Sequence, residues 1–278
     1  MSKSEAPQSL SAYRQMMDEA LRTHDSWLAL AGLFWLKPGV NTIGSGEASQ
    51  VQLPAEHAPS KLGILELDGD HVFMRIQPPH SVKIDGRDVS QAELEPDTSE
   101  SPTIVHLGPL TWVAIERGDR LGIRLWDNSR PEMHAVPGRS WFAEDSQYRV
   151  TAGFSAQDGN RELRIESTIG DVELVRAAGK LTFELEGEAL SLQAMGDPDS
   201  GLWILFKDLT NGESTYAPGR YLTTGPVDGG RVELDFNRAY NPPCAFTAYA
   251  TCPLPPIENH LPVRIEAGEK LPEWKADH

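Results

Sequence analysis

The stretch "PTIVHLGPLTWVAIERGDRLGIRLWD", residues 102–127, decides the fold expected for this chain. β-Branched and aromatic residues occur in it in short runs, which are separated by the turn signals Gly108-Pro109 and Gly118-Asp119. The stretch "LGILELDGDHVFMRIQ", residues 62–77, shows the same pattern around Asp68-Gly69. Several short strands at this spacing predict an antiparallel β-sandwich.

The same pattern returns in the second half of the chain, for example in residues 161–196 and in "LPVRIEAGEK", residues 261–270. Residues 128–141 lie between the halves, and we expect them to connect two modules. The predicted fold class is mainly β. It consists of an N-terminal helical segment over residues 1–38, a β-sandwich over 39–130 and a second antiparallel β domain over 131–278.

The helical segment is predicted from the spacing of its apolar residues. Four of them recur at the spacing of one helix face after a capping serine, Ser9 or Ser11: Leu10, Tyr13, Met17 and Leu21. A second start is indicated at Asp25-Ser26. The run that follows, "SWLALAGLFWL" at 26–36, is apolar on nearly every face, so we expect it to be buried as part of this helical segment.

Composition limits the classes of function. The chain has 278 residues, 39% of them hydrophobic, with seven Trp and a formal net charge of -16. This length can bury a large core. The charge argues against nucleic acid and against an anionic membrane as partners, since both require basic patches.

The N-terminus has no signal-peptide pattern and no apolar run is long enough to span a membrane, so we expect a cytoplasmic protein. The two cysteines are then expected to be thiols.

Four stretches between Leu33 and Asp127 resemble forkhead-associated (FHA) domains. They are "GVNTIGSGEASQVQLP" (39–54), "APSKLGILELDG" (58–69), "SVKIDGRDVSQAEL" (81–94) and "GDRLGIRLWD" (118–127). The resemblance implies an FHA-like sandwich. FHA domains read phosphothreonine with an early Arg, then a Ser, and an Asn near a Gly turn. Here Ser45 stands at the place of the Arg, Ser60 at that of the Ser, Gly63 replaces the usual His, and Val82-Lys83 lie near the expected Asn. Without the Arg, the strongest charge-assisted contact is lost, and a phosphopeptide partner is not expected.

Three stretches resemble the bacterial family named domain of unknown function 1684. They are "WLALAGLFWLKPGVNTIGSG" (27–46), "FKDLTNGESTYAPGRYL" (206–222) and "DFNRAYNPPCAFTAYATCPLPPIENHLPVRIEAGEK" (235–270). Together they extend the resemblance over the whole chain. It implies a bacterial, β-rich protein and carries no reaction, cofactor or substrate with it.

The last of these stretches holds the densest group of polar candidates. It contains both cysteines and five prolines over residues 235–256, and Pro242-Pro243 stiffens the backbone after Asn241. A rigid, uncharged loop between charged strands can form the wall of a ligand pocket. It can equally be a closing segment whose Asn and Tyr side chains satisfy buried backbone groups. The candidate ligand-binding residues are Asp208, Tyr216, Arg220, Asn237, Tyr240, Asn241, Cys244, Cys252 and Glu266.

Other chemistries remain open as minority hypotheses. Seven residues lie between Cys244 and Cys252, and this spacing does not match a zinc knuckle. No metal or other cofactor is therefore expected. A Cys nucleophile with His260 as base would make the protein a hydrolase. So would a pair of carboxylates drawn from Asp208, Asp235, Glu266 and Glu269. The leading hypothesis is a small ligand in a polar pocket of the C-terminal β domain. The alternatives are that hydrolase and an interaction module that acts through the FHA-like domain.

Overall fold

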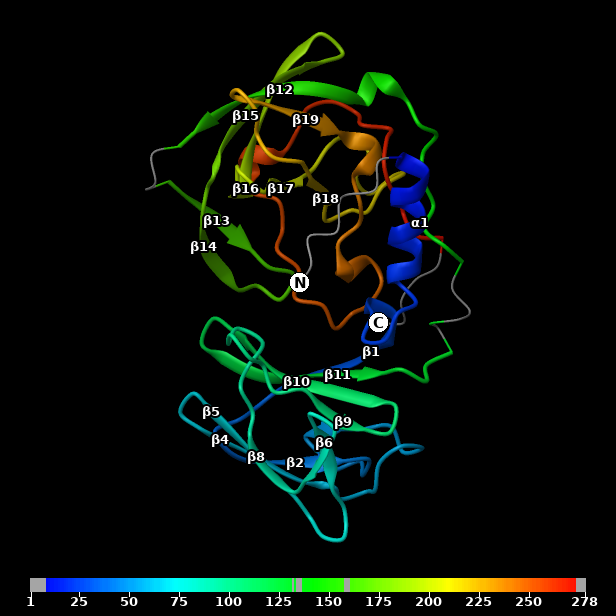
Figure 1. Ribbon diagram of the computed structural model, residues 1–278, viewed down its shortest axis with the longest axis vertical. Coiled ribbons are helices and arrows are strands. Elements are labelled where there is room, and N and C mark those ends of the chain that lie inside the picture. Colours follow the sequence, from blue (N-terminus) through cyan, green and yellow to red (C-terminus); the bar gives the residue numbers. More distant parts are fainter. Residues whose placement is uncertain (1–8, 132, 134–136, 158–160, 274–278) are drawn as a thin grey trace. The chain divides into compact units, whose positions relative to one another are not determined.

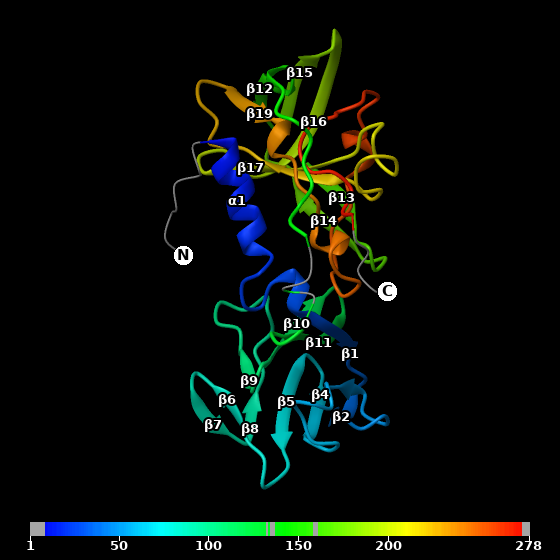
Figure 2. The same cartoon turned by 90° about the vertical axis from the view of Figure 1, so that its right-hand side faces the viewer.

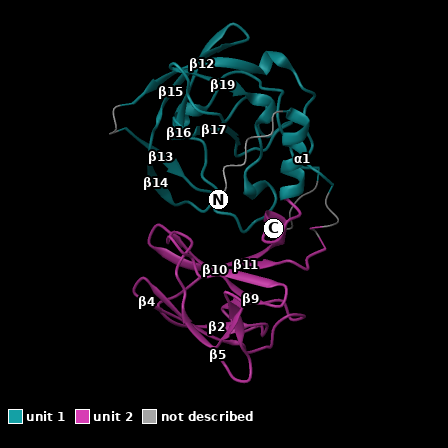
Figure 3. Cartoon of the chain, viewed as in Figure 1, with its two compact units in different colours: residues 1–20, 136–278 teal, residues 21–135 magenta. Residues whose placement is uncertain are grey.

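The chain forms two compact units. The computed structural model describes residues 9–131, 133, 137–157 and 161–273. Unit 1 comprises residues 1–20 and 136–278, and unit 2 comprises residues 21–135 (Figure 3). The predicted mainly β class is confirmed, with antiparallel sheets in both units. The first predicted helix is also confirmed: it is α1, Leu10–Ala20, and it belongs to unit 1 although unit 2 follows it directly in sequence.

Unit 2 contains two sheets (Figures 1 and 2). The strand orders are β1-β11-β10-β9-β6-β7 and β3-β2-β4-β5-β8, and every pair is antiparallel except β2 with β3. The strands of the first sheet are β1 (Leu30–Trp35), β6 (Val82–Ile84), β7 (Arg87–Val89), β9 (Val105–Leu107), β10 (Leu110–Arg117) and β11 (Arg120–Asp127). Those of the second are β2 (Gly39–Gly44), β3 (Val51–Gln52), β4 (Gly63–Asp68), β5 (His71–Ile76) and β8 (Gln91–Glu93).

The stretch at 102–127 forms three neighbouring strands, as predicted. β10 pairs with β9 on one side and with β11 on the other, in registers that put Leu110 beside Leu107 and Arg117 beside Arg120. Gly108 and Gly118 stand in the two turns with φ of 56° and 59°, a conformation that glycine adopts at low cost. The hairpins form where they were expected because tight turns fix both the partner and the register locally.

One apolar core joins the two sheets of unit 2. Trp112 and Ile123 come from the first sheet, Leu65 and Met74 come from the second, and all four are buried in one cluster. Alternate residues of each strand supply these side chains, because successive side chains of a strand point to opposite faces. Unit 2 is therefore a β-sandwich.

The expectation of a helix over residues 26–36 is wrong. Only Trp27–Ala29 form a short 3₁₀ turn, and Leu30–Trp35 form strand β1, which pairs with β11 from Leu30↔Trp126 to Trp35↔Gly122. An apolar run does not by itself distinguish a buried strand from a buried helix. Gly32 weakens a helix in the middle of the run, and the ladder with a strand about ninety residues later decides the outcome.

Unit 1 is built on a six-stranded sheet with the order β18-β17-β16-β15-β12-β19, and on a separate hairpin, β13-β14 (Figure 1). The strands of the sheet are β12 (Arg149–Ala156), β15 (Gly179–Leu185), β16 (Glu188–Asp197), β17 (Gly201–Phe206), β18 (Arg220–Thr223) and β19 (Arg231–Asp235). The hairpin consists of β13 (Glu162–Glu166) and β14 (Val172–Arg176). Further 3₁₀ turns are η2 (Ser146–Tyr148), η3 (Phe236–Arg238), η4 (Pro243–Ala245) and η5 (Ile257–Asn259).

Residues 261–267 close the core of unit 1 without forming a strand. Leu261, Val263, Ile265 and Ala267 are buried in the main apolar cluster, and the residues between them are exposed. This is the alternation that predicted a strand there. The segment does not join the ladder of any sheet, so its backbone polar groups need other partners.

Val105→Ala is expected to destabilise unit 2 by about 2 kcal/mol, because it removes two buried methyl groups and leaves a small cavity. Val105 is fully buried in the sandwich core. Val40→Ala is the matched control, since Val40 lies on β2 of the same unit and is 55% exposed. Urea unfolding measures both changes. Equal losses in the two variants would contradict the assignment of Val105 to the core.

Candidate functional site

Two of the residues predicted for the ligand site form a buried ion pair. Arg220 begins β18, Asp208 follows β17, and Arg220 Nη2 lies 2.7 Å from Asp208 Oδ2 with both side chains completely buried. The Arg220 guanidinium also donates to the carbonyl oxygens of Ile265, at 2.9 Å, and of Ala267. Its donors thus satisfy two carbonyl oxygens of the segment at 261–267, which joins no sheet. Burial lowers the pKa of Arg220, and Asp208 opposes that shift by stabilising the cation.

The second oxygen of Asp208 organises the loop after β17. Asp208 Oδ1 accepts hydrogen bonds from the Thr210 N–H, at 2.8 Å, and from the Thr210 hydroxyl, at 2.5 Å. The Asn211 side chain accepts from the Asp208 N–H and donates to the Tyr216 carbonyl. The polar groups of Asp208 and Arg220 therefore contact other protein groups, and they hold this loop in place.

Asp208→Asn is expected to cost about 3 kcal/mol of unfolding free energy, because it leaves the Arg220 charge buried without its counter-charge. The exposed pair Arg264–Glu213, at 2.9 Å, provides the control, and Glu213→Gln should change stability little. Chemical denaturation of both variants compares a buried with an exposed ion pair in one unit. A small loss in the Asp208 variant would show that the carboxylate charge is not needed there.

Asn237 and Asn241 also make internal contacts. The Asn237 side chain donates to the carbonyl of Asp145 and accepts from the Asp145 N–H, so it joins η3 to the start of η2. Asn241 Nδ2 donates to the Lys270 carbonyl at 2.8 Å, and the Asn241 N–H donates to Glu269 Oε2 at 2.7 Å. Both residues are buried. They fix the course of the chain on either side of Tyr240.

Glu269 is a buried carboxyl that sequence reasoning weighed only as a member of a hydrolytic carboxylate pair. Its Oε2 lies 2.7 Å from Arg139 Nη1, and the side chain is 1% exposed. Burial raises the pKa of Glu269 to about 7, and the opposing effects of Arg139 and of the Asn241 N–H do not cancel that rise. The folded protein therefore holds a proton on Glu269 at pH values where the unfolded chain has lost it.

Glu269 should make folding pH-dependent between about 4.5 and about 7. The pKa of Glu269 is higher in the folded state than in the unfolded chain. Glu269 therefore contributes its full stabilisation below pH 4.5, and this stabilisation, about 3 kcal/mol at most, is lost as pH rises toward 7. Glu269→Gln removes this titration, so its stability deficit relative to the unmodified protein should shrink as pH rises. Urea unfolding across this range measures the deficit, with the exposed Glu266→Gln as control. If the stability deficit of Glu269→Gln instead grows with pH, the attraction of Arg139 lowers the pKa of Glu269 more than burial raises it.

Tyr216, Cys244 and Cys252 lie together. Tyr216 donates from its hydroxyl to the Cys244 carbonyl at 2.8 Å, and the Cys244 N–H lies 3.1 Å from Cys252 Sγ. Tyr240 packs beside them through Tyr221, with ring centroids 5.8 Å apart. Glu266, the remaining candidate, is exposed and faces Arg264 instead. The nine candidates thus divide into an internal frame, a thiol cluster and one surface residue.

A cavity of about 780 Å³ adjoins the proline-rich part of the family stretch in unit 1. We call it the signature cavity. Its wall is made by residues 254–258 and by Ala217 and Pro218. Its polar residues come from three places in the chain. These are Arg164, Glu166 and Thr168 from β13 and the turn after that strand, Lys207 from the end of β17, and Glu258 and His260 from η5 and its C-terminal cap. Its volume falls within the range usual for small-molecule sites.

Backbone pairing assembles this cavity. Ser167 bridges to Pro253, and Lys207 bridges to His260, so residues 253–260 run between the hairpin and the end of β17. Pro255 lies against Gly219, where a Cβ would come within 2.5 Å of the Pro255 ring. Gly219 has φ of 126°, which also requires glycine. Glycine at 219 thus permits the close approach of the cavity wall.

Sequence reasoning missed Arg164 and Lys207 as cavity residues. The alternation of β13 does place Arg164 and Glu166 on its exposed face, opposite the buried Leu163 and Ile165. That signal shows which side faces outward, but not that residues 254–260 lie beside it. His260 was weighed only as a partner for the cysteines.

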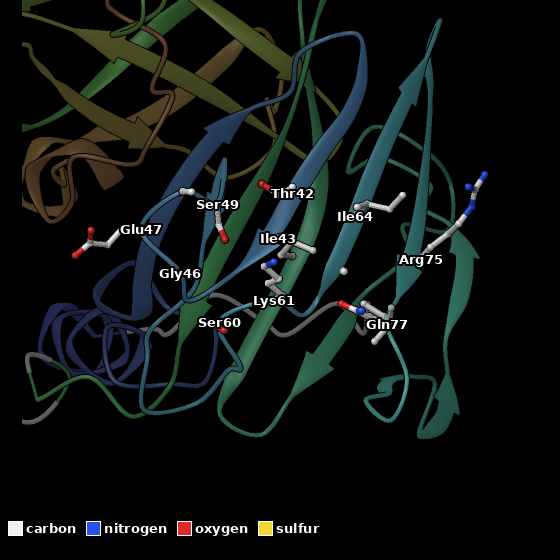
Figure 4. Close-up of a pocket in the computed structure, with 13 residues that line it drawn as sticks. Thr42, Ile43, Gly46, Glu47, Ser49, Ser60, Lys61, Ile64, Arg75 and Gln77 are labelled. Carbon is white, nitrogen blue, oxygen red and sulfur yellow. The ribbon is translucent and has the colours of Figure 1, made fainter.

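Unit 2 has a separate cavity of about 600 Å³ on the second sheet (Figure 4). Ser60 and Lys61 line it together with Thr42, Ile64 and the loop at 46–49. Ser45, at the place of the FHA arginine, donates its hydroxyl to the Ala58 carbonyl and does not line the cavity. Arg75 points away from Ser60 and Lys61 and pairs with Glu66 at 2.9 Å.

Within the described ranges, no three His, Cys, Asp or Glu side chains gather closely enough to hold a metal ion. No described helix has the length and apolar character needed to cross a membrane.

The fold and these sites define a two-unit, mainly β protein whose C-terminal stretch lines a cavity. Residues 135–270 match the family model described as "Protein of unknown function (DUF1684)". The stretch at 27–46, which also resembles the family, lies outside the matched residues. No curated protein matches the chain.

Several solved structures are similar to part of the chain. An uncharacterized protein of Haloarcula marismortui, solved by NMR, is 34% identical, with 51% of this chain and 80% of that chain covered and a TM-score of 0.42. The FhaA FHA domain, solved in complex with an intracellular domain, is 16% identical over 34% of this chain and 96% of its own, with a TM-score of 0.25. A further FHA structure, Rv0020c_FHA, is 17% identical over 37% of this chain and 99% of its own, with a TM-score of 0.24.

Proposed function

We propose that the protein binds a small organic anion in the signature cavity of unit 1. The observation that carries this proposal is the pairing of Lys207 with His260. The two residues are neighbours in a parallel bridge, and both line the cavity. Among the described residues, neither the Lys207 ammonium nor the His260 ring has a hydrogen-bond or ion-pair partner. A cation of this kind, in a chain of net charge -16, is available for a carboxylate or phosphate.

The carboxylates of the cavity are already engaged. Glu166 lies 4.0 Å from Arg164, and Glu258 lies 3.8 Å from Arg161. These exposed pairs are weak, but each places a positive group beside the negative one. Lys207 and His260 therefore face the cavity without a competing acid of their own.

The apolar residues of the lining favour an apolar part on the same ligand. Leu254, Pro255, Pro256 and Ile257 line the cavity, and Ile257 is 75% exposed. Prolines hold such a wall in one conformation, so little ordering entropy is lost on binding. A carboxylate with a short hydrocarbon chain matches both the Lys207–His260 pair and these apolar residues.

The hydrolase alternative has less support. Asp208 and Glu269, two of its candidate carboxylates, are buried and held by Arg220 and Arg139. A general acid or base must reach the substrate proton, and these two face protein groups instead. Binding without catalysis accounts for the arrangement with fewer assumptions.

Octanoate and inorganic phosphate test the proposal as probes. Octanoate is expected to raise the melting temperature of the protein and to bind more tightly than phosphate, because its tail contacts the proline wall. Lys207→Met keeps most of the side-chain volume and removes one charge-assisted contact, so octanoate affinity should fall about 10- to 100-fold. Isothermal titration calorimetry measures the affinities.

Lys180→Met is the matched control, because Lys180 lies on β15 of the same unit and does not line the cavity. It should leave the octanoate affinity unchanged. The proposal fails if Lys207→Met binds octanoate as well as the unmodified protein, or if neither probe binds.

A further inference from the structure

The two cysteines of the chain lie next to each other in the fold. The Cys244 N–H donates to Cys252 Sγ at 3.1 Å. Since the N–Cα bond is about 1.46 Å long, that sulfur lies within about 4.6 Å of the Cys244 Cα. This separation is compatible with the short Cβ–Cβ distance that a disulfide requires. Both residues are free thiols in this structure.

Both backbones are held in place from outside the loop that joins them. The Tyr216 hydroxyl donates to the Cys244 carbonyl at 2.8 Å. Thr168 holds Cys252 twice, since its hydroxyl accepts from the Cys252 N–H at 3.1 Å and its own N–H donates to the Cys252 carbonyl at 2.8 Å. The two thiols are thus positioned by separate parts of unit 1. Bond formation between them needs little further ordering of the chain.

The two thiols differ in exposure and in acidity. Cys244 is half-buried, and Cys252 is buried at 4% exposure. The neighbouring Cys252 thiol lowers the pKa of Cys244 by hydrogen bonding to its thiolate, against the effect of burial. The same contact with Cys244, together with burial, raises the pKa of Cys252. This is the division between an attacking thiol and a resolving thiol.

We propose that Cys244 and Cys252 form a redox-active dithiol that reduces a hydroperoxide and closes to a disulfide. The Cys244 thiolate attacks the terminal oxygen of the hydroperoxide, the O–O bond breaks, and the leaving alkoxide takes up a proton to become an alcohol. Cys244 is then a sulfenic acid. The Cys252 sulfur attacks Cys244 Sγ, the S–S bond forms, and hydroxide leaves with the Cys252 proton as water. The two thiols lose two electrons in total, and a dithiol reductant restores them by exchange.

This proposal is independent of anion binding in the signature cavity. Cys244 and Cys252 do not line that cavity, and Lys207 and His260 take no part in the thiol chemistry. Loss of either property would leave the other unchanged. A disulfide would nevertheless fix the chain two residues before Leu254, where the cavity wall begins.

The first test uses the unmodified full chain and one equivalent of hydrogen peroxide. Thiol titration under denaturing conditions should find two thiols before oxidation, none after it, and two again after dithiothreitol. The oxidised protein should be lighter by two hydrogens, and a digest should contain the peptide that links Cys244 to Cys252. Retention of both thiols, or oxidation to sulfinic acid without a linked peptide, would overturn the proposal.

Two single variants separate the roles of the thiols. Cys252→Ser should stop at a sulfenic acid on Cys244, which dimedone traps as a stable adduct. Cys244→Ser should react with peroxide at least 10-fold more slowly than the unmodified protein, because the remaining thiol is buried and held protonated. If Cys244→Ser instead reacts as fast as the unmodified protein, Cys244 is not the attacking thiol and the proposal is wrong. Native-state circular dichroism of both variants shows whether each comparison is made on folded protein.

Discussion

The buried Arg220–Asp208 pair is the interaction on which unit 1 depends. Residues 261–267 supply four buried side chains to the core but have no place in a sheet ladder. The Arg220 guanidinium presents several fixed donors, and it satisfies the carbonyls of Ile265 and Ala267 from the side. Burying this cation is costly, and the Asp208 carboxylate offsets the cost. The ion pair thus satisfies two carbonyls of a segment that joins no sheet. Asp208 and Asn211 also fix the loop from Asp208 to Tyr216.

This frame explains why residues that looked like ligand contacts from the sequence have internal roles. Asn237, Asn241 and Arg220 combine polar chemistry with rigid neighbours, which is also the composition of a binding site. In the structure these rigid, buried residues support the thiol cluster and the wall of the signature cavity. The chain after Asn241 reaches the thiol cluster, and the chain after Pro253 becomes the wall of the signature cavity. The surface candidates are therefore Lys207, His260 and Arg164, and the buried residues hold their backbone in position.

The parts of the fold that could be predicted are those determined by local contacts. The hairpins of residues 102–127 follow from turns and alternation, and α1 follows from helical spacing. Residues 26–36 were misjudged because the pairing of β1 with β11 is non-local. The signature cavity has the same origin, since the bridges Ser167–Pro253 and Lys207–His260 join parts of the chain far apart in sequence. The gap of seven residues between Cys244 and Cys252 does not show that they are neighbours, yet η4 and the turn after it bring the two thiols together.

The position of unit 2 in the sequence has a consequence for biosynthesis. α1 is translated before unit 2, but its contact with η3, through the hydroxyl of Tyr13 and the carbonyl of Arg238, joins residues more than two hundred positions apart. Residues 21–135, in contrast, hold every strand of the sandwich in one continuous stretch. On the ribosome the sandwich can finish folding while unit 1 has only its first helix, since domains fold as units during synthesis. The apolar face of α1 therefore stays uncovered until η3, at Phe236–Arg238, has been synthesised.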